Sequence, residues 1–402
     1  MAPKFRFDHP DRALEALAEK LATVQEVERS KNLVGRVLAS AVVADRDSPA
    51  ADVSAMDGYA IQLSELQTKK SIVVTGESSP GGPPPILEPN SAVRIFTGAI
   101  VPTEADLVIK REDTEESELR IQLRESAMQC QAGEHIRRTG ENATAGSVVL
   151  HPGIRLTAAH RATMANFGSD EADVYAPVTT SIITTGDEVG VQAGTKPQPW
   201  QLRDSNRVSL SAMLDPIPWT KLHAIDHADD QQATLRTVLE NHLEKSDAVL
   251  LTGGVSMGNY DYVPDVIRDL GGEIVFHGLP IRPGKPVLGA ATKDGKLILG
   301  LPGNPVSATI GCRRLALPLL AKISGQTHWN PPCPIVGLKN PGDKTIPLHW
   351  LKLVRLSDTG LAEVVISQGS GDLVSLGQSS GFVEVTSGHT GEGPWPYYSW
   401  EI

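Results

Sequence analysis

The chain has 402 residues, of which 40% are hydrophobic and 21% are charged, a balance typical of a globular protein with about two to four domains. Its formal net charge of −11 argues against a nucleic-acid-binding surface, which needs clustered Lys and Arg. No apolar run is long enough to span a bilayer, and the three cysteines lack the spacing of metal or disulfide sites. We therefore expect a cytoplasmic protein that binds neither nucleic acid nor membrane.

The first predicted element is an amphipathic helix. Its apolar residues recur at helical spacing from Ala13 to Val27, Asp11 is the expected N-cap, and the helix should end between Asn32 and Gly35. Short β-like runs follow as far as residue 60. Among them the peptide SAMDGYA holds Asp57 in a tight turn, although taken alone this pattern is better explained as a plain turn.

Residues 71–130 alternate strand-like segments with Gly/Pro-rich connections and predict a compact β subdomain. Thr97 follows one of these strands and places a hydroxyl group at its end. Arg137 and Arg138 lie next to glycines, so they are either an anion site or surface charge. A short helix is predicted over residues 157–167, capped by Thr157 and ended by Gly168.

Between residues 175 and 325 strands and helices alternate. The predicted strands are 178–184, 221–225, 248–251, 273–276, 286–290 and 297–299. The predicted helices are 205–214, 230–243, 263–270 and 305–323. This alternation predicts a doubly wound, mainly parallel sheet. The tail from residue 334 to residue 402 is predicted to form a small β domain.

One turn of this sheet shows the clearest sequence signal for a ligand site. Four apolar residues ending at Leu251 give way abruptly to Gly253 and Gly254, as at the carboxyl end of a buried parallel strand, where ligands bind in open α/β sheets. The peptide that follows, GGVSMG, fits neither the dinucleotide fingerprint nor the P-loop. Taken alone, the turn is better explained as an ordinary connection between a strand and a helix.

Polar residues gather in the loops at the same edge. The carboxylates of Asp187, Glu188 and Asp261 would repel one another unless a divalent cation lay among them, and oxygen ligands suit Mg²⁺. Arg282 and Lys285 flank a Pro-Gly turn and match phosphate. Further members of these loops are Arg203, Asp204, Ser205, Asn206, Ser256, Pro302, Gly303 and Asn304. Together they predict a site for a phosphorylated ligand and a metal.

In order and spacing, a series of peptides resembles the MoeA-type molybdenum insertases, a family that includes the E domain of gephyrin. The peptides are SAMDGYA, IFTGAIVP, IRRTGEN, TTGDEV, RDSN, TGGVSMGNYDYV, RPGKP and GLPGNPVSA, and they extend over nearly the whole chain. The resemblance implies that molybdate and adenylylated molybdopterin react, with Mg²⁺, to give molybdenum cofactor and AMP. It also implies a homodimer whose cleft is shared between subunits, and molybdopterin adenylyltransferase as a possible partner.

The resemblance assigns roles to individual residues. The implied catalytic residues are Asp57, Thr97, Glu188, Asp261 and Lys285, and the implied metal ligands are Asp187, Glu188, Asp230 and Asp261. The implied substrate-binding residues are Arg203, Asp204, Ser205, Asn206, Gly253, Gly254, Ser256, Arg282, Pro302, Gly303, Asn304 and Ser370, the last from the tail peptide GSGDLVSL. His349, Trp350, Lys352 and Arg355 either face the pterin or form an edge strand.

The family likeness also implies a division into four domains. We expect a helical and linker domain over 1–40 and 134–172, an inserted β-rich subdomain over 41–133, a molybdopterin-binding α/β domain over 173–326 and a C-terminal β domain over 332–402.

The sequence departs from the family pattern at a few positions. Asn142 stands where Asp is common, Arg282 where Lys is frequent, and Ala51-Asp52-Val53 replaces the usual lead-in. These departures leave open a binding or scaffolding protein without turnover. A molybdopterin adenylyltransferase is the other alternative.

Overall fold

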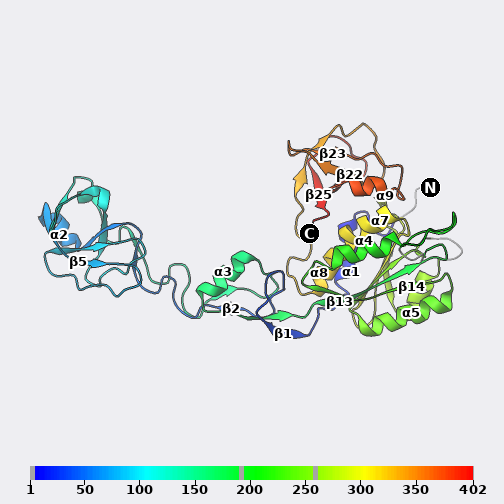
Figure 1. Ribbon diagram of the computed structural model, residues 1–402, viewed down its shortest axis with the longest axis horizontal. Coiled ribbons are helices and arrows are strands. Elements are labelled where there is room, and N and C mark those ends of the chain that lie inside the picture. Colours follow the sequence, from blue (N-terminus) through cyan, green and yellow to red (C-terminus); the bar gives the residue numbers. More distant parts are fainter. Residues whose placement is uncertain (1–4, 190–193, 257–260, 402) are drawn as a thin grey trace. The chain divides into compact units, whose positions relative to one another are not determined.

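The computed structural model describes residues 5–189, 194–256 and 261–401 (Figure 1). The chain divides into two compact units. The larger comprises Met1–Ser40, Pro152–Arg161 and Glu171–Ile402, and the smaller comprises Ala41–His151 and Ala162–Asp170. The predicted division into four domains stays a prediction. Within the described residues, no helix combines the length and the apolar character needed to span a bilayer.

The smaller unit is built on a six-stranded sheet. In spatial order its strands are β7 (Leu107–Lys110), β4 (Gly58–Ile61), β6 (Ser91–Ile95), β5 (Ser71–Ser78), β9 (Arg120–Leu123) and β8 (Thr114–Glu116). Two short pairs, β2 (Val42–Val43) with β11 (Val148–Leu150) and β3 (Val53–Ser54) with β10 (Ile136–Arg137), and helix α2 (Leu63–Thr68) complete it. Apolar side chains cover both faces of the sheet, which explains the nearly continuous burial of β4, β6 and β7.

The larger unit contains the predicted α/β sheet. Its spatial order is β14 (Thr220–Ala228), β13 (Val178–Thr185), β15 (Ala248–Thr252), β19 (Leu297–Leu301), β18 (Leu288–Ala291) and β16 (Glu273–His277). The first four strands run parallel, whereas β18 is antiparallel to both of its neighbours. The sheet is therefore mixed but mainly parallel, and the expected fold class is confirmed.

Helices cover both faces of this sheet. Ile182 of β13 and Leu250 of β15 belong to one core, with α1 (Pro10–Ala18), α4 (Ser205–Leu214), α7 (Pro305–Gly311) and α8 (Leu317–Ile323). Ile183 and Leu251 belong to the opposite core, with α5 (Gln232–Lys245) and α6 (Val263–Asp269). Successive residues of a strand point to opposite faces, so the sheet is doubly wound as predicted (Figure 1). A π-helical turn, Cys312–Ala316, joins α7 to α8.

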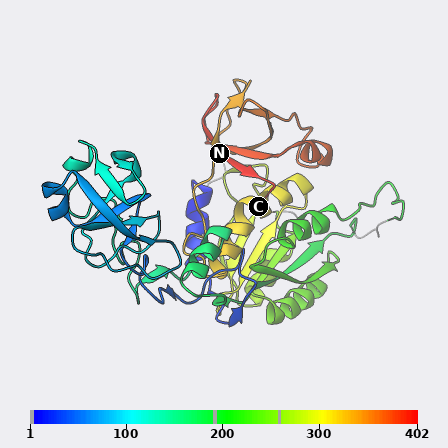
Figure 2. The ribbon, with the colours of Figure 1, turned by 60° about the vertical axis from the view of Figure 1, so that its left-hand side comes forward.

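The tail forms a second sheet in the larger unit. Its strands are β20 (Ile335–Val336), β21 (Leu338–Lys339), β22 (His349–Leu356), β23 (Ala362–Val364), β24 (Gly381–Val385) and β25 (Trp395–Ser399), with helix α9 (Leu373–Gln378) beside them. Figure 2 shows this orange and red sheet next to the yellow helices α7 and α8. Strand β17 (Ile281–Arg282), which lies between β16 and β18 in the chain, pairs with β22, so the two sheets meet at that point.

The prediction for the first helix was wrong in its start and its length. The N-cap is His9, whose side chain accepts a hydrogen bond from the backbone of Asp11, and the helix ends at Ala18. Ala22 and Val24 donate their backbone N–H groups to Gly295 and Ile323, so tertiary contacts replace the helical hydrogen bonds. Strand β1 (Val27–Ser30) then pairs with β12 (Ala172–Tyr175). Helix α3 (Ala158–Asn166) lies within the predicted range.

Candidate functional site

The glycine turn after β15 lies against the loops that follow β13 and β19. Gly253 has φ +90° and Gly254 has φ +63°, and a Cβ at Gly253 would stand 2.5 Å from Thr185 Oγ1. Gly253 donates its backbone N–H to Leu301 O at 3.0 Å. A Cβ built on Gly303 would lie 3.6 Å from Gly253 Cα. Only glycine fits at position 253, so this edge of the sheet is closed tightly around its backbone.

Helix α4 begins at the same edge. Asp204 is its N-cap: one carboxylate oxygen accepts the N–H of Arg207 at 2.9 Å, and the other accepts the Thr184 hydroxyl at 2.7 Å. Asn206 donates its side-chain amide to Gly303 O at 2.8 Å, while its buried Oδ1 has no hydrogen-bond partner. The predicted loop Arg203 to Asn206 is thus fixed to the glycine turns, with one amide oxygen left to accept a hydrogen bond.

Three of the predicted metal ligands form an acidic group at this edge. Asp187 Oδ1 accepts the backbone N–H of Asp230 at 3.1 Å. Burial raises the pKa of Asp230, and the negative charges of Asp187 and Glu188 raise it further. The neighbouring Asp229 has a buried Oδ1 without a hydrogen-bond partner. An all-oxygen set of mutually repelling carboxylates fits Mg²⁺ chemically.

The oxygens of the acidic group do not lie as close together as the ligands of a bound metal ion. Among the described residues, the three-residue group whose possible ligand atoms all lie within 4.8 Å is His9, His349 and Glu384, not the predicted carboxylates. Asp261 is half-buried. It directly follows residues 257–260 of the central turn, which lie outside the described residues. Ser256, just before them, is exposed.

A cleft of about 710 Å³ lies between the α/β domain and the tail sheet. Its lining includes the predicted residues Arg282, Lys285, Pro302, Asn304 and Ser370. Two peptides far apart in the sequence, RPGKP and LPGNP, therefore meet the tail in one cavity. This volume suits a ligand of cofactor size.

The opposite wall of the cleft comes from the tail. Trp350 and Lys352 line it, and the Lys352 ammonium lies 4.3 Å from the centre of the Trp350 ring. Burial lowers the pKa of Lys352. Of the other two residues of the predicted group, His349 is buried in an ion-pair cluster and Arg355 pairs with Glu363 at 3.8 Å. Only half of that group therefore faces the cleft.

The smaller unit holds Asp57 and Thr97. The backbone N–H and the hydroxyl group of Thr97 both donate to Asp57 Oδ1, at 2.8 and 2.7 Å. These bonds hold the pKa of Asp57 below its usual value. A Cβ on Gly58 would overlap the carbonyl oxygen of Ile109 across the β4–β7 pair. The SAMDGYA turn thus presents an exposed, ionised carboxylate from a closely packed strand.

The arginines of IRRTGEN are occupied by carboxylates. Arg137 donates to Glu141 at 2.5 Å and to Asn142 Oδ1 at 2.8 Å. Arg138 contacts Asp52 at 2.5 Å, and the backbone N–H of Thr139 donates to the same carboxylate at 2.9 Å. The loop is therefore held together internally, and Asn142 keeps the acceptor that an Asp would supply.

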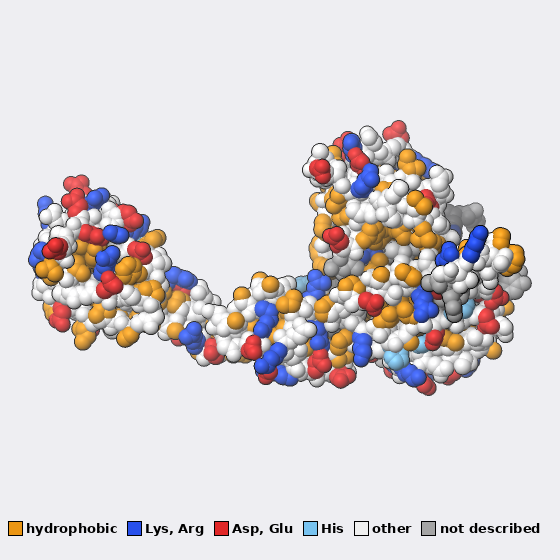
Figure 3. Space-filling view, viewed as in Figure 1, with side chains coloured by type: hydrophobic (Ala, Val, Ile, Leu, Met, Phe, Trp, Pro, Cys, Tyr) orange, Lys and Arg blue, Asp and Glu red, His pale blue; other side chains and the backbone are white. Residues whose placement is uncertain are grey.

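Charges of both signs are interspersed on the face of the molecule seen in Figure 3. This mixture agrees with the formal net charge of −11 and differs from the basic patch of a nucleic-acid-binding surface.

Comparisons with known proteins agree with this picture. Residues 9–168 match the family described as "MoeA N-terminal region (domain I and II)", and residues 181–322 match "Probable molybdopterin binding domain". The molybdopterin molybdenumtransferase of Haemophilus influenzae is 33% identical over 80% of this chain and 79% of its own. That of Synechocystis is 30% identical over 91% of this chain and 93% of its own.

Solved structures agree as well. A molybdopterin biosynthesis MoeA protein from Pyrococcus horikoshii superposes with a TM-score of 0.71 at 26% identity, covering 98% of each chain. A second structure from this organism has a TM-score of 0.76 at 23% identity over 97% of each chain and supports the fold.

Proposed function

The chain belongs to the molybdopterin molybdenumtransferase (MoeA) family of molybdenum cofactor biosynthesis, and from this premise we propose its reaction in detail. It inserts molybdenum from molybdate into adenylylated molybdopterin and releases AMP in a Mg²⁺-dependent step. The observation that carries the proposal is the 710 Å³ cleft, in which Arg282, Lys285 and Lys352 meet an aromatic side chain. Cations for phosphate and molybdate thus lie beside an aromatic surface for a pterin ring.

The basic residues bind and orient the anionic substrates. Arg282 offers a planar fork of donors, which matches two oxygens of one phosphate, whereas Lys285 supplies a point charge. Both lie on the short loop around the left-handed Gly284, at φ +99°. As the phosphoanhydride breaks, negative charge grows on the departing AMP, and these two cations are positioned to stabilise it.

The acidic group at the sheet edge is the proposed Mg²⁺ site. Asp187, Glu188, Asp230 and Asp261 would hold the ion, which when bound supplies Lewis-acid polarisation of the phosphoanhydride. The raised pKa of Asp230 supports this role, because a carboxylate repelled by its neighbours gains from a cation. Asn206, whose buried Oδ1 lacks a partner, would accept a hydrogen bond from the substrate.

The smaller unit contributes Asp57 and Thr97. Thr97 keeps Asp57 ionised and fixes the direction of its carboxylate. We propose that this carboxylate acts on substrate bound at the cleft of a second subunit, in a homodimer. No covalent intermediate with the enzyme is required.

A non-catalytic binding protein is the alternative that the sequence left open through Asn142. The contacts of Asn142 favour retained turnover, because its Oδ1 accepts from Arg137 as an Asp would, and no free charge is left behind. Partnership with a molybdopterin adenylyltransferase and a cytoplasmic location stay predictions.

The test is release of AMP from adenylylated molybdopterin by the purified full chain, with and without molybdate and Mg²⁺. We expect release only when both are present, and loss of release in the Lys285→Met variant. Lys293→Met, on an exposed lysine away from the cleft lining, is the matched control and should keep full activity. Tight binding without molybdate-dependent AMP release would support the non-catalytic alternative instead.

A further inference from the structure

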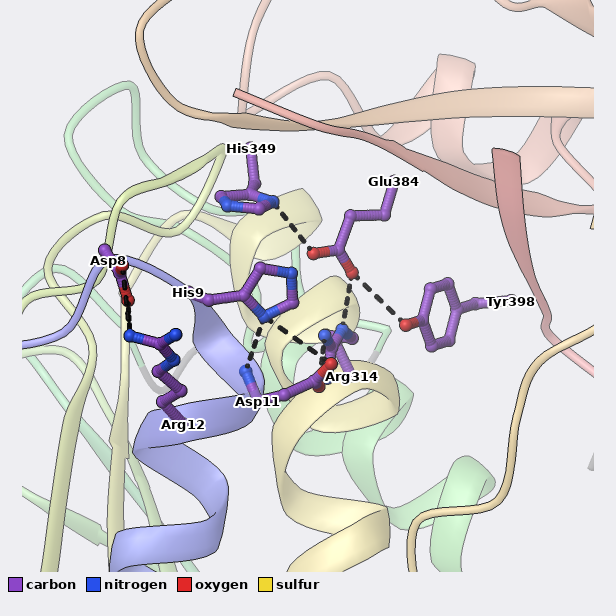
Figure 4. Close-up of polar contacts among 8 residues, drawn as sticks. All are labelled: Asp8, His9, Asp11, Arg12, Arg314, His349, Glu384 and Tyr398. Atoms are coloured by element: carbon purple, nitrogen blue, oxygen red, sulfur yellow. Dashed lines mark hydrogen bonds and ion pairs between the residues drawn. The ribbon is translucent and has the colours of Figure 1, made fainter. Parts of the chain in front are cut away.

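A buried cluster at the junction of the N-terminal segment, the π-helical turn and the tail sheet takes no part in the proposed reaction. It contains His9, His349, Glu384, Arg314 and Tyr398 (Figure 4). One possible metal-binding atom from each of His9, His349 and Glu384 lies within 4.8 Å of the other two. Figure 4 shows both imidazoles turned toward the Glu384 carboxylate.

The two oxygens of Glu384 are used unequally. Oε2 accepts from Arg314 Nε at 2.7 Å and from the Tyr398 hydroxyl at 3.2 Å. Oε1 is buried and makes no hydrogen bond of good geometry; its contact is an ion pair with His349 Nδ1 at 3.3 Å. Oε2 is thus fully used, whereas Oε1 keeps the capacity to bind a cation.

One distance within the cluster fits a tetrahedral ion. His349 Nδ1 stands 3.3 Å from Glu384 Oε1, which is long for a hydrogen bond between these atoms. Two ligand atoms bound to one Zn²⁺ at about 2.0–2.1 Å in tetrahedral geometry are separated by about 3.3–3.4 Å. The existing distance therefore matches an edge of a zinc coordination tetrahedron.

The charges of the cluster also leave room for a cation. The Arg314 guanidinium contacts both Glu384 and Asp11 at 2.7 Å, so one positive charge faces two negative ones. Burial favours the neutral carboxyl form of Glu384, but the contacts with His349 and Arg314 outweigh it and lower its pKa to about 2.

We propose that His9, His349 and Glu384 form a Zn²⁺ site, with water as the fourth ligand. The side chain of His9 is 40% exposed and provides the entry path, whereas His349 is 3% exposed. Arg314 and Tyr398 orient the carboxylate from behind. In this structure His9 Nδ1 accepts the backbone N–H of Asp11 at 3.2 Å. Metal binding by Nε2 would place the ring proton on Nδ1, where Asp11 Oδ2 at 3.5 Å could accept it in place of that N-cap bond.

The site would join three parts of the larger unit. His9 precedes α1, Arg314 belongs to the turn between α7 and α8, and His349 begins β22. The partner of His349 across the strand pair is Ile281, and the next pair joins Trp350 to Arg282, both of which line the cleft. Zinc bound here would therefore fix the tail wall of the cleft against the α/β domain. This inference does not depend on the proposed reaction.

The experiment is a Co²⁺ titration of the full chain after removal of metals with a chelator. We expect one tight Co²⁺ per chain, with visible absorption bands of a four-coordinate ion that Zn²⁺ removes. His9→Asn deletes one imidazole but retains an N-cap acceptor, so the fold of α1 is kept. That variant and His349→Gln should bind more than about 100-fold more weakly. The exposed His389→Gln is the matched control and should bind as the wild type does.

Two results would overturn the proposal. One is Co²⁺ binding that His9→Asn and His349→Gln leave unchanged, which would mean an adventitious ion only. The other is the absence of stoichiometric Co²⁺ binding, together with a histidine titration which shows that His349 and Glu384 share only a proton. Asp230→Asn should leave Co²⁺ binding unchanged, so failure here is distinguishable from failure of the Mg²⁺ proposal. Circular dichroism of each variant checks that the chain is folded.

Discussion

Thr97 donates two hydrogen bonds to a single oxygen of Asp57, one from its backbone and one from its hydroxyl group. Because both bonds favour the carboxylate, the pKa of Asp57 is lowered, with the backbone bond as the larger cause. Thr97→Val removes only the hydroxyl bond, so the pKa of Asp57 should rise partway toward its usual value. The acid limb of the pH–rate profile for AMP release should then move to higher pH. Thr97→Ser keeps the hydroxyl group and should leave the limb where it is.

Gly58 is a position where any side chain collides with backbone. A Cβ there would overlap the carbonyl oxygen of Ile109, so β4 and β7 must move apart in Gly58→Ala. We expect a loss of about 3 kcal/mol in the free energy of unfolding of the smaller unit, measured by urea denaturation. At Gly98 the φ is +83° but a Cβ meets no atom within 4 Å, so Gly98→Ala should cost only about 1 kcal/mol. Equal losses would show that β4 and β7 relieve the overlap at position 58 at little cost.

Asp230 is destabilised as an anion by burial and by Asp187 and Glu188. A carboxyl group with a raised folded-state pKa opposes folding above its unfolded pKa, because the folded state holds its proton more tightly. Asp230→Asn should therefore raise the melting temperature at pH 7 in the presence of a chelator. In millimolar Mg²⁺ the order should reverse, since only the wild type gains from the ion. A variant that is less stable in both buffers would contradict the assignment of Asp230 to the acidic group.

The sheet edge could be predicted from sequence because its signals are local. The break from Leu251 to Gly253 reflects a strand end and a backbone approach that only glycine allows, and the structure has both. Arg282 and Lys285 were also identifiable, because a Pro-Gly turn fixes the loop between them. They share a cleft with Asn304 because their loop follows β16, which runs in the same direction as β19, so both strands end at one edge of the sheet.

The tail wall and the N-terminal helix could not be predicted in the same way. Lys352 and His349 lie on one strand, yet one lines the cleft and the other is buried against Glu384, because their side chains point to opposite faces of β22. The first helix ends at Ala18 because Gly295 and Ile323 take the following backbone N–H groups. Such partners are distant in the sequence, and periodicity carries no information about them.

The contacts of Glu384 with His349 and Arg314 make acid stability depend on one buried carboxylate. Its pKa falls from 4.5 to about 2 on folding, so the stabilisation is fully present above pH 4.5 and is lost as the pH falls toward 2. The shift corresponds to roughly 3 kcal/mol. In a chelator, Glu384→Gln should therefore flatten the dependence of unfolding free energy on pH between 5 and 2, relative to the exposed control Glu392→Gln.

Arg314→Met should cost about 3–5 kcal/mol of unfolding free energy at neutral pH, because it leaves the Glu384 carboxylate buried without its cation. Combining the two substitutions should cost less than the sum of the single losses. Additive losses would mean that the two groups do not stabilise each other.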